Sequence, residues 1–333
     1  MNFLKTNWLP VLMGIIISVW ILFQILKPSP IENSPVVEEV SAWVGPGKYQ
    51  IPIYTDSGKL IAYGRDLIEN TAKYLGPKGS VLQITNGMNC QNCHLDAGTK
   101  PFGNNYGAVY SMYPKFRDRS GAMESIFKRV NDCLQRSLHG KALDTTSKEM
   151  QAIHAYMKWL GGNVRKGEKP FGSGIVDLPL LNRAADPVKG NAVYISKCQS
   201  CHGEDGQGKK SIDEISFIYP PLWGNQSYNT GAGLFRITRF AGYVKNNMPF
   251  GQVSYHNPQL TNEEAWDVAA FVNSQPRPAG DISNDWPDIS KKPIDHPFGP
   301  YTDSFSETQH KYGPFNPIKM AKEEAAKNKK QAK

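Results

Sequence analysis

The hydrophobic positions of the chain form one long uninterrupted run near its start. Residues 8–26, WLPVLMGIIISVWILFQIL, carry no charge and lie between Lys5 and Lys27. As a helix this run would be about 28 Å long, which is enough to cross the apolar core of a bilayer. A cleavable signal peptide has a shorter apolar run before a small-residue cleavage site, whereas KPSPIENSPVV follows here. The pattern favours a retained membrane anchor over a cleaved signal within residues 1–27, with residues 28–44 as a tether.

Two later stripes of apolar residues have helical spacing and share a register. Each begins after a Thr that is followed three positions later by Glu, which is the pattern of a capping box. Ile153 and Val268 come seven positions after Thr146 and Thr261, respectively. The two stripes are Met150, Ile153, Tyr156, Met157 and Leu160, and Ala265, Val268, Phe271 and Val272. The chain therefore contains two copies of one helical unit, and the stripes are predicted to be core positions.

Composition and charge narrow the class of protein. The 333 residues suffice for two domains, and 38 Lys and Arg against 30 Asp and Glu give a net charge of +8. Half of that charge lies in residues 319–333, which hold six Lys and two Glu. Such a tail is a solvated helix or a disordered segment, or else a docking arm for an acidic partner or a membrane surface. The remaining charge gives no support for nucleic-acid binding.

Four of the five cysteines form two C-x-x-C-H motifs, Cys90-Gln-Asn-Cys93-His94 and Cys198-Gln-Ser-Cys201-His202. Two thiols at this spacing can form thioethers with one haem, and the following His then lies under the iron as proximal ligand. A zinc site made of two such pairs is the alternative, but zinc pairs lie about 15–20 residues apart, and here 108 residues separate Cys90 from Cys198. A thioredoxin-like pair would lack the adjoining His. The motifs predict two covalently bound haem c groups.

The internal repeat predicts the sixth iron ligands, expected from a loop between each motif and the last helix. Met248 is the only Met between His202 and Thr261, 13 positions before that Thr. The position 13 residues before Thr146 is Cys133, the unpaired cysteine. A Met can also be a core residue and a lone Cys a small buried apolar one. The sequence leaves Met112, Met123 and His139 as competing ligands for the first haem. A thiolate lowers the potential of iron and a thioether raises it, so the two haems should differ.

Basic residues surround Cys133 in the sequence. Arg119, Arg129 and Arg136 lie 14 and 4 positions before and 3 positions after it, and Ser137 follows. If they converge, they form an anion site, because guanidinium groups bind oxyanions through paired charge-assisted hydrogen bonds. They could instead bind haem propionates or face solvent. An oxyanion site beside a sulfur ligand on iron favours a substrate that is both anionic and nucleophilic through sulfur, and thiosulfate has both properties.

The run Arg129-x-x-x-Cys133-x-x-Arg136-Ser137-x-x-Gly140, between two C-x-x-C-H motifs, resembles the thiosulfate dehydrogenase family of dihaem cytochromes c. The resemblance covers residues 45–276. It implies that His94 and Cys133 ligate a catalytic haem, that Cys133 can carry a sulfur adduct, and that the arginines and Ser137 hold the substrate. Some relatives place a Lys directly before the methionine ligand and exchange ligands on reduction. Here that position is Asn247, and Lys245 lies three positions before Met248.

These inferences define the expected architecture. We expect a mainly α protein with two class I cytochrome c-type domains in tandem. The expected boundaries are an anchor or signal at 1–27, a tether at 28–44, a catalytic haem domain at 45–165, a linker at 166–185, an electron-transfer haem domain at 186–276 and an extended C-terminal segment at 277–333. Because haem c is attached outside the cytoplasm, we expect a periplasmic enzyme tethered to the inner membrane.

The expected reaction couples two thiosulfates to tetrathionate, or runs in reverse as tetrathionate reduction. Electrons would pass from the His/Cys haem to the His/Met haem and on to a soluble c-type cytochrome or a similar carrier. Three alternatives stay open at this stage: a membrane-anchored dihaem electron-transfer cytochrome without catalysis, a cysteine-ligated sulfur oxidase that works with a carrier protein, and a zinc-binding module. His256, His296 and His310 are expected at the surface.

Overall fold

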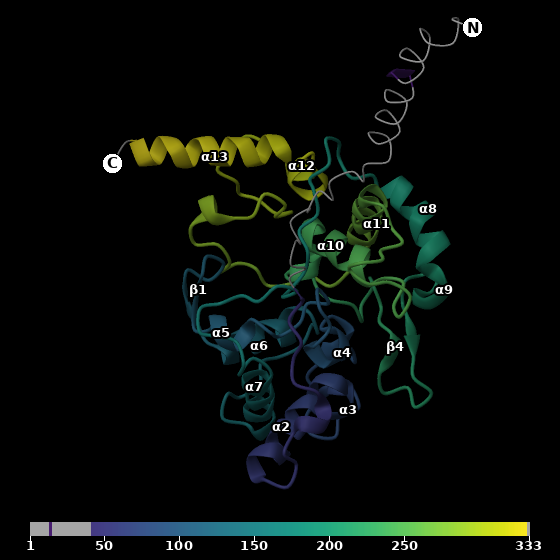
Figure 1. Ribbon diagram of the computed structural model, residues 1–333, viewed down its shortest axis with the longest axis vertical. Coiled ribbons are helices and arrows are strands. Elements are labelled where there is room, and N and C mark those ends of the chain that lie inside the picture. Colours follow the sequence, from purple (N-terminus) through teal and green to yellow (C-terminus); the bar gives the residue numbers. More distant parts are fainter. Residues whose placement is uncertain (1–12, 15–40, 332–333) are drawn as a thin grey trace, which may run out of the picture. The chain divides into compact units, whose positions relative to one another are not determined.

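The computed structural model describes residues 13–14 and 41–331 (Figure 1). The predicted anchor at 8–26 therefore lies outside the described residues, apart from Met13 and Gly14. Among the described helices, none is long and apolar enough to cross a membrane. Residues 42–331 belong to one compact unit, which is mainly helical and contains two small antiparallel hairpins.

The first half of this unit is a set of short helices around one crossing of two longer ones. The crossing helices are α2 (Asp56–Glu69) and α7 (Lys148–Leu160). The elements between and before them are η1 (Lys48–Gln50), α3 (Thr71–Leu75), η2 (Cys90–Asn92), α4 (Leu95–Gly98), α5 (Val109–Met112), β1 (Lys115–Arg117), β2 (Ala122–Glu124) and α6 (Ile126–Arg136). Strands β1 and β2 pair with Phe116 opposite Met123.

The second half repeats this plan with α8 (Pro187–Lys197) packed on α11 (Asn262–Ser274), as Figure 1 shows. The elements between them are α9 (Gln199–His202), β3 (Lys209–Lys210), β4 (Phe217–Tyr219), η3 (Gly233–Phe235) and α10 (Ile237–Asn247). Asp186 caps α8 and accepts a hydrogen bond from the Val188 backbone N–H at 2.8 Å, with Pro187 in the first turn.

Glycine allows the same close helix crossing in both halves. A Cβ atom on Gly64 of α2 would lie 1.9 Å from the carbonyl oxygen of Ala152, and one on Gly190 of α8 would lie 1.9 Å from that of Asp267. Ala152 and Asp267 are each six positions after Thr146 and Thr261, so the crossings agree with the register of the repeat. The structure thus contains two copies of one helical unit.

Of the two predicted capping boxes, at Thr146 and Thr261, the structure contains the second. Thr261 and Glu264 form the expected capping box, with Glu264 N–H donating to Thr261 Oγ1 at 3.1 Å. The predicted box at Thr146 is wrong, because α7 begins one residue later and Ser147 caps it by accepting from Met150 N–H. The Thr146 hydroxyl instead donates to the Asp144 carboxylate. This local side-chain contact replaces a hydrogen bond to the first turn of the helix.

The segment after α11 is largely irregular, as expected, and contains η4 (Ile289–Lys291), α12 (Glu307–Tyr312) and α13 (Asn316–Gln331). Phe315 and Ile318 anchor α13 in the core, while the rest of this Lys-rich helix is largely exposed. The expectation that His296 and His310 are surface residues is wrong, since they are 6% and 2% exposed. Both imidazoles can be buried because their ring nitrogens form hydrogen bonds with backbone or Asp303 oxygens. His256 is exposed, as expected.

Candidate functional site

The first C-x-x-C-H motif lines a cavity in the first half. Cys90, Cys93 and His94 share this cavity with Cys133 of α6. The Nδ1 atom of His94 donates to the carbonyl oxygen of Asn104 at 2.5 Å, which leaves Nε2 without that proton and available to a metal. Burial lowers the pKa of His94 to about 4, which favours the neutral, ligating form. The arrangement places the two motif thiols, one imidazole and a third sulfur, that of Cys133, around one cavity.

The second motif lines a similar cavity in the second half. Cys198, Cys201 and His202 share it with Met248. His202 repeats the orientation of His94, since its Nδ1 donates to the carbonyl oxygen of Pro220 at 2.8 Å. Burial again lowers the pKa of this imidazole. The wall is mostly apolar and includes Leu222, Leu234, Phe240, Val244, Leu260 and Val268.

Both sets of residues fit covalently bound haem. None of the five cysteines is in a disulfide, and burial raises the pKa of the Cys90 thiol to about 11 and that of the Cys198 thiol to about 12. A zinc site would require four ligands to converge. In the described part of the chain, no group of three or more His, Cys, Asp or Glu side chains is placed to hold a metal ion. Covalent attachment of haem would use two thiols for the thioether bonds and one imidazole for the iron, and each motif provides these groups.

The two candidate ligand sulfurs lie in or directly after the penultimate helix of each half. Cys133 lies within α6, so the expectation of a loop position is wrong there. Met248 follows the last residue of α10 directly and leads into a turn, as expected. The competing ligands for the first haem do not line its cavity: Met112 and Met123 are absent from its wall, and His139 bonds to Asn229.

Met157 is predicted as a core residue, and in the structure it also lines the first cavity. Val272 occupies the same register and lines the second cavity, so the repeat itself carried this signal.

The two polar residues that precede Met248 donate hydrogen bonds to backbone carbonyl oxygens. Asn247 is fully buried and donates to the carbonyl oxygens of Phe102 and Tyr243, and Lys245 donates to the carbonyl oxygen of Leu260 at 2.7 Å.

A strongly cationic cleft adjoins the first cavity. Cys93, His94 and Cys133 line both. The basic residues of the cleft are Arg117, Arg119, Arg129, Arg136, Lys169, Arg236 and Arg239, and its acidic residues are Glu124 and Asp132. The predicted residues Arg119, Arg129, Arg136 and Ser137 therefore converge on one cleft with Cys133. Arg236, Arg239 and Lys169 were not predicted, because they lie far from Cys133 in the sequence.

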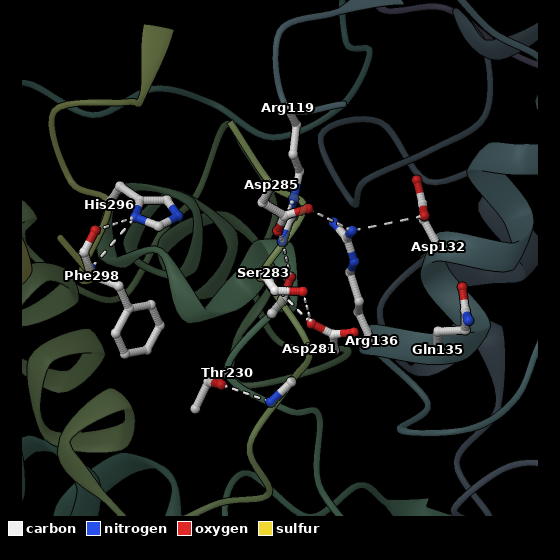
Figure 2. Close-up of polar contacts among 12 residues, drawn as sticks. Arg119, Asp132, Gln135, Arg136, Thr230, Asp281, Ser283, Asp285, His296 and Phe298 are labelled. Carbon is white, nitrogen blue, oxygen red and sulfur yellow. Dashed lines mark hydrogen bonds and ion pairs between the residues drawn. The ribbon is translucent and has the colours of Figure 1, made fainter. Parts of the chain in front are cut away.

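Two of the predicted arginines are held by a carboxylate from the C-terminal segment. Figure 2 shows Asp285 between the guanidinium groups of Arg119 and Arg136. Its Oδ2 accepts from Arg119 Nη2 at 2.7 Å, and its Oδ1 accepts from Arg136 Nη2 at 2.9 Å. The Asp285 side chain is only 7% exposed. No sequence pattern indicated this contact, which joins positions more than a hundred residues apart.

Arg129 differs from the other arginines of the cleft. Arg117, Arg236 and Arg239 pair with Glu124, Asp295 and Asp177, respectively. Within the described ranges, the Arg129 guanidinium makes no ion pair or hydrogen bond. The coulombic interaction with the nearby Cys133 side chain raises the pKa of Arg129 above its usual value. Arg129 precedes Cys133 by four positions on α6, so both lie on one face of the helix, and an unpaired cation stands beside a sulfur.

The fold and the two motif-lined cavities define a dihaem c-type cytochrome. The comparisons with known proteins agree: residues 187–276 match the family model described as cytochrome c, and residues 82–163 match the one described as SoxA/TsdA, cytochrome c domain.

Relatives of this chain carry the name thiosulfate dehydrogenase. The protein from Stutzerimonas stutzeri is 33% identical over 252 residues, covering 74% of this chain and 78% of the relative. The protein from Allochromatium vinosum is 37% identical over 225 residues, covering 66% and 79%. A solved structure of thiosulfate dehydrogenase (TsdBA) from Marichromatium purpuratum in the "as isolated" form matches with a TM-score of 0.65 and 29% identity, covering 71% of this chain and half of that one.

The chain belongs to the thiosulfate dehydrogenase family. It is an oxidoreductase with two cytochrome c domains, and these domains carry covalently bound haem c.

Proposed function

We propose that this enzyme couples two thiosulfates to tetrathionate and passes the two electrons to a redox carrier. The observation that supports this most is the pairing of Cys133 with Arg129 on one face of α6, where both line the first cavity and the cationic cleft. The names of the relatives support the same substrate. A cation without a carboxylate partner can bind a sulfonate group, and the adjacent sulfur can react with the other end of thiosulfate.

The proposed chemistry balances in two steps. The Cys133 thiolate and the terminal sulfur of the first thiosulfate form an S–S bond, releasing two electrons and leaving a cysteine-bound S–SO3 group. The terminal sulfur of the second thiosulfate then attacks the sulfur atom that is bonded to Cys133 Sγ. This attack forms tetrathionate and releases the Cys133 thiolate. No proton is exchanged. When bound, the two haems supply two one-electron acceptors, which match the two electrons released.

Arg129 acts on the charges of the substrate. Two dianions repel each other as they approach, and fixed cations in a partly desolvated cleft offset that repulsion. The Arg129 guanidinium can donate to a sulfonate, and the Ser137 hydroxyl, which lines the same cleft, adds a neutral donor. The reverse reaction uses the same contacts, because tetrathionate carries the same two sulfonate groups.

The test is an assay of acceptor reduction that depends on thiosulfate, run with the purified dihaem protein in both directions. We expect formation of tetrathionate and reduction of a c-type cytochrome by the native enzyme. Cys133→Ala should abolish turnover while a haem stain on a denaturing gel shows that haem stays attached. Turnover retained in Cys133→Ala would refute the proposed mechanism.

The same experiment distinguishes the two redox alternatives. A dihaem cytochrome that only transfers electrons would be reduced by its donor but would not consume thiosulfate. A sulfur oxidase that depends on a carrier protein would oxidise free thiosulfate only after that protein is added. Activity with thiosulfate and a cytochrome alone argues against both.

We also propose that the enzyme acts in the periplasm, tethered by residues 8–26. The charge-free run and the need to attach haem outside the cytoplasm support this location. Native protein should sediment with membranes and be released by detergent but not by high salt. Release by salt alone would contradict the tether and point to the Lys-rich α13 as the membrane contact instead.

A further inference from the structure

The segment after α11 forms part of the cationic cleft, although it lies outside both residue ranges that match the family models. It is first fixed to the second half of the molecule, where Gly280 N–H donates to Thr230 Oγ1 at 2.9 Å. A tight turn follows, in which Asp281 accepts from the backbone and hydroxyl of Ser283. Figure 2 shows this turn leading to Asp285.

At the end of the turn, the segment contacts the first half of the molecule through three groups. The Asp285 carboxylate binds Arg119 and Arg136 (Figure 2). The backbone N–H of Trp286 donates to the carbonyl oxygen of Arg119 at 2.7 Å. Pro287 packs so closely on the hairpin turn that a Cβ on Gly121 would lie 2.6 Å from its Cγ. The segment therefore joins the two halves beside the cleft.

The backbone is strained at this contact. Trp286 has a φ of 61°, a conformation that a bulky residue seldom adopts. Residues in such conformations persist only where their surroundings hold them, and they gather at functional sites. Here the hydrogen bond from Trp286 N–H to Arg119 and the burial of the Asp285 side chain supply the compensating contacts.

The Asp285 contacts leave part of each guanidinium group available. Arg119 uses Nε and Nη2 toward Asp285 and Gly231, while its Nη1 makes none of these contacts. Arg136 uses only Nη2, toward Asp285 at 2.9 Å and toward Asp132 Oδ1 at 4.0 Å, while its Nε and Nη1 make none of these contacts. Both residues line the cleft that contains Cys133. The Asp285 carboxylate between the two guanidinium groups fixes both side chains, so that the remaining donors keep one orientation. Asp132 contributes less to Arg136, because it lies 4.0 Å away and pairs more closely with Lys128.

We propose that Asp285 is a positioning residue that presents Arg119 and Arg136 as a second oxyanion-binding unit of the cleft. This inference rests on the proposed function, which requires two sulfonate-bearing substrates at once. Arg129 binds one sulfonate beside Cys133, and the Arg119–Asp285–Arg136 unit binds the other. Without Asp285 the two arginines would repel each other and lose their common orientation.

The test uses the full-length dihaem enzyme with Asp285→Ala and Asp285→Glu. The probe is sulfate, a tetrahedral dianion without redox chemistry, and its affinity for the oxidised protein is measured by calorimetry. We expect Asp285→Ala to weaken sulfate binding and to lower kcat/KM for thiosulfate by about tenfold each, as loss of an oriented charge-assisted contact predicts. Asp285→Glu, which keeps the carboxylate, should recover most of the loss.

Chemical rescue separates positioning from a merely structural role. Formate supplies the missing carboxylate and should restore kcat/KM in Asp285→Ala, whereas neutral formamide should not. Asp177→Ala is the matched control, because Asp177 also pairs with an arginine of the cleft, Arg239, but is 76% exposed. That variant should behave like the native enzyme.

The outcomes are distinct. Unchanged sulfate affinity in Asp285→Ala, or a loss that neither formate nor Asp285→Glu recovers, overturns the proposal. If the native enzyme does not oxidise thiosulfate but Asp285→Ala loses sulfate affinity and formate restores it, the proposed function fails and the positioning role stands.

Discussion

The two haem domains share a scaffold and differ in what surrounds Cys133 and Met248. In both, a glycine lets two helices cross at one register, and the motif His donates Nδ1–H to a backbone carbonyl. The Cys133 cavity shares its wall with a cleft that holds seven basic residues. The Met248 cavity is mostly apolar, and Lys197 is the one Lys or Arg in its wall among the residues that the structure describes. A duplicated electron-transfer unit thus becomes a candidate catalytic unit through its surroundings, while its internal packing stays the same.

The most direct test of this comparison replaces Cys133 of the first domain with Met, the residue at the corresponding position of the second domain. We expect Cys133→Met to keep both haems and to lower the rate of thiosulfate oxidation by at least about 10³-fold, because a thioether cannot form and release the proposed disulfide-type adduct. The rate is measured by tetrathionate formation. The reciprocal change, Met248→Cys, should not create activity in that background. Appreciable turnover in Cys133→Met would show that the distal sulfur is only a ligand.

The charges around the two cavities offer a second test. Arg129→Gln should lower kcat/KM for thiosulfate by roughly 30- to 150-fold, the equivalent of about 2–3 kcal/mol for a charge-assisted contact with a dianion. Steady-state kinetics with a cytochrome acceptor measure this loss. Lys197→Gln is the control in the second cavity, and it should change kcat/KM for thiosulfate by less than about twofold, since no substrate contacts it. Equal losses in both variants would contradict the division of roles.

The shared scaffold predicts equal packing effects in the two domains. Gly64→Ala and Gly190→Ala place a methyl group against a backbone oxygen at the helix crossing. Each should lower the free energy of unfolding by about 1–3 kcal/mol, measured by denaturant unfolding of the dihaem protein. Gly47→Ala is the control, because its Cβ would meet only a side-chain oxygen 4.0 Å away. A large effect in one domain alone would show that the crossings are not equivalent.

The smallest effect concerns salt. The Debye length falls from about 30 Å to about 8 Å when ionic strength rises from about 0.01 M to 0.15 M. The KM for thiosulfate should therefore rise severalfold, because the cationic cleft attracts the dianion less strongly. Reduction of the haems by a neutral reductant should keep its rate, since that process does not use the cleft. A KM that is independent of salt would indicate that the paired arginines contribute no field at the substrate.

The sequence alone predicts haem attachment, because each motif consists of residues that are adjacent along the chain. Two cysteines and a histidine at fixed spacing predict haem attachment in either domain, and the repeat register brought Cys133 and Met248 to corresponding places. The structure adds that the helix crossings at Ala152 and Asp267 follow the same register. The register did not predict that Cys133 lies within a helix or that Ser147 replaces Thr146 as a cap, because helix ends depend on competing local hydrogen bonds.

The partners of the arginines were decided only by the tertiary structure. The sequence determined that Arg119, Arg129 and Arg136 surround Cys133, but not which of them is paired. Asp285 lies 166 residues from Arg119 and 149 from Arg136 along the chain, and folding of the C-terminal segment brings it between them. Arg129 keeps no such partner in the described chain. The strength of a charge depends on distance, burial and counter-charges, and these quantities exist only once distant segments have packed together.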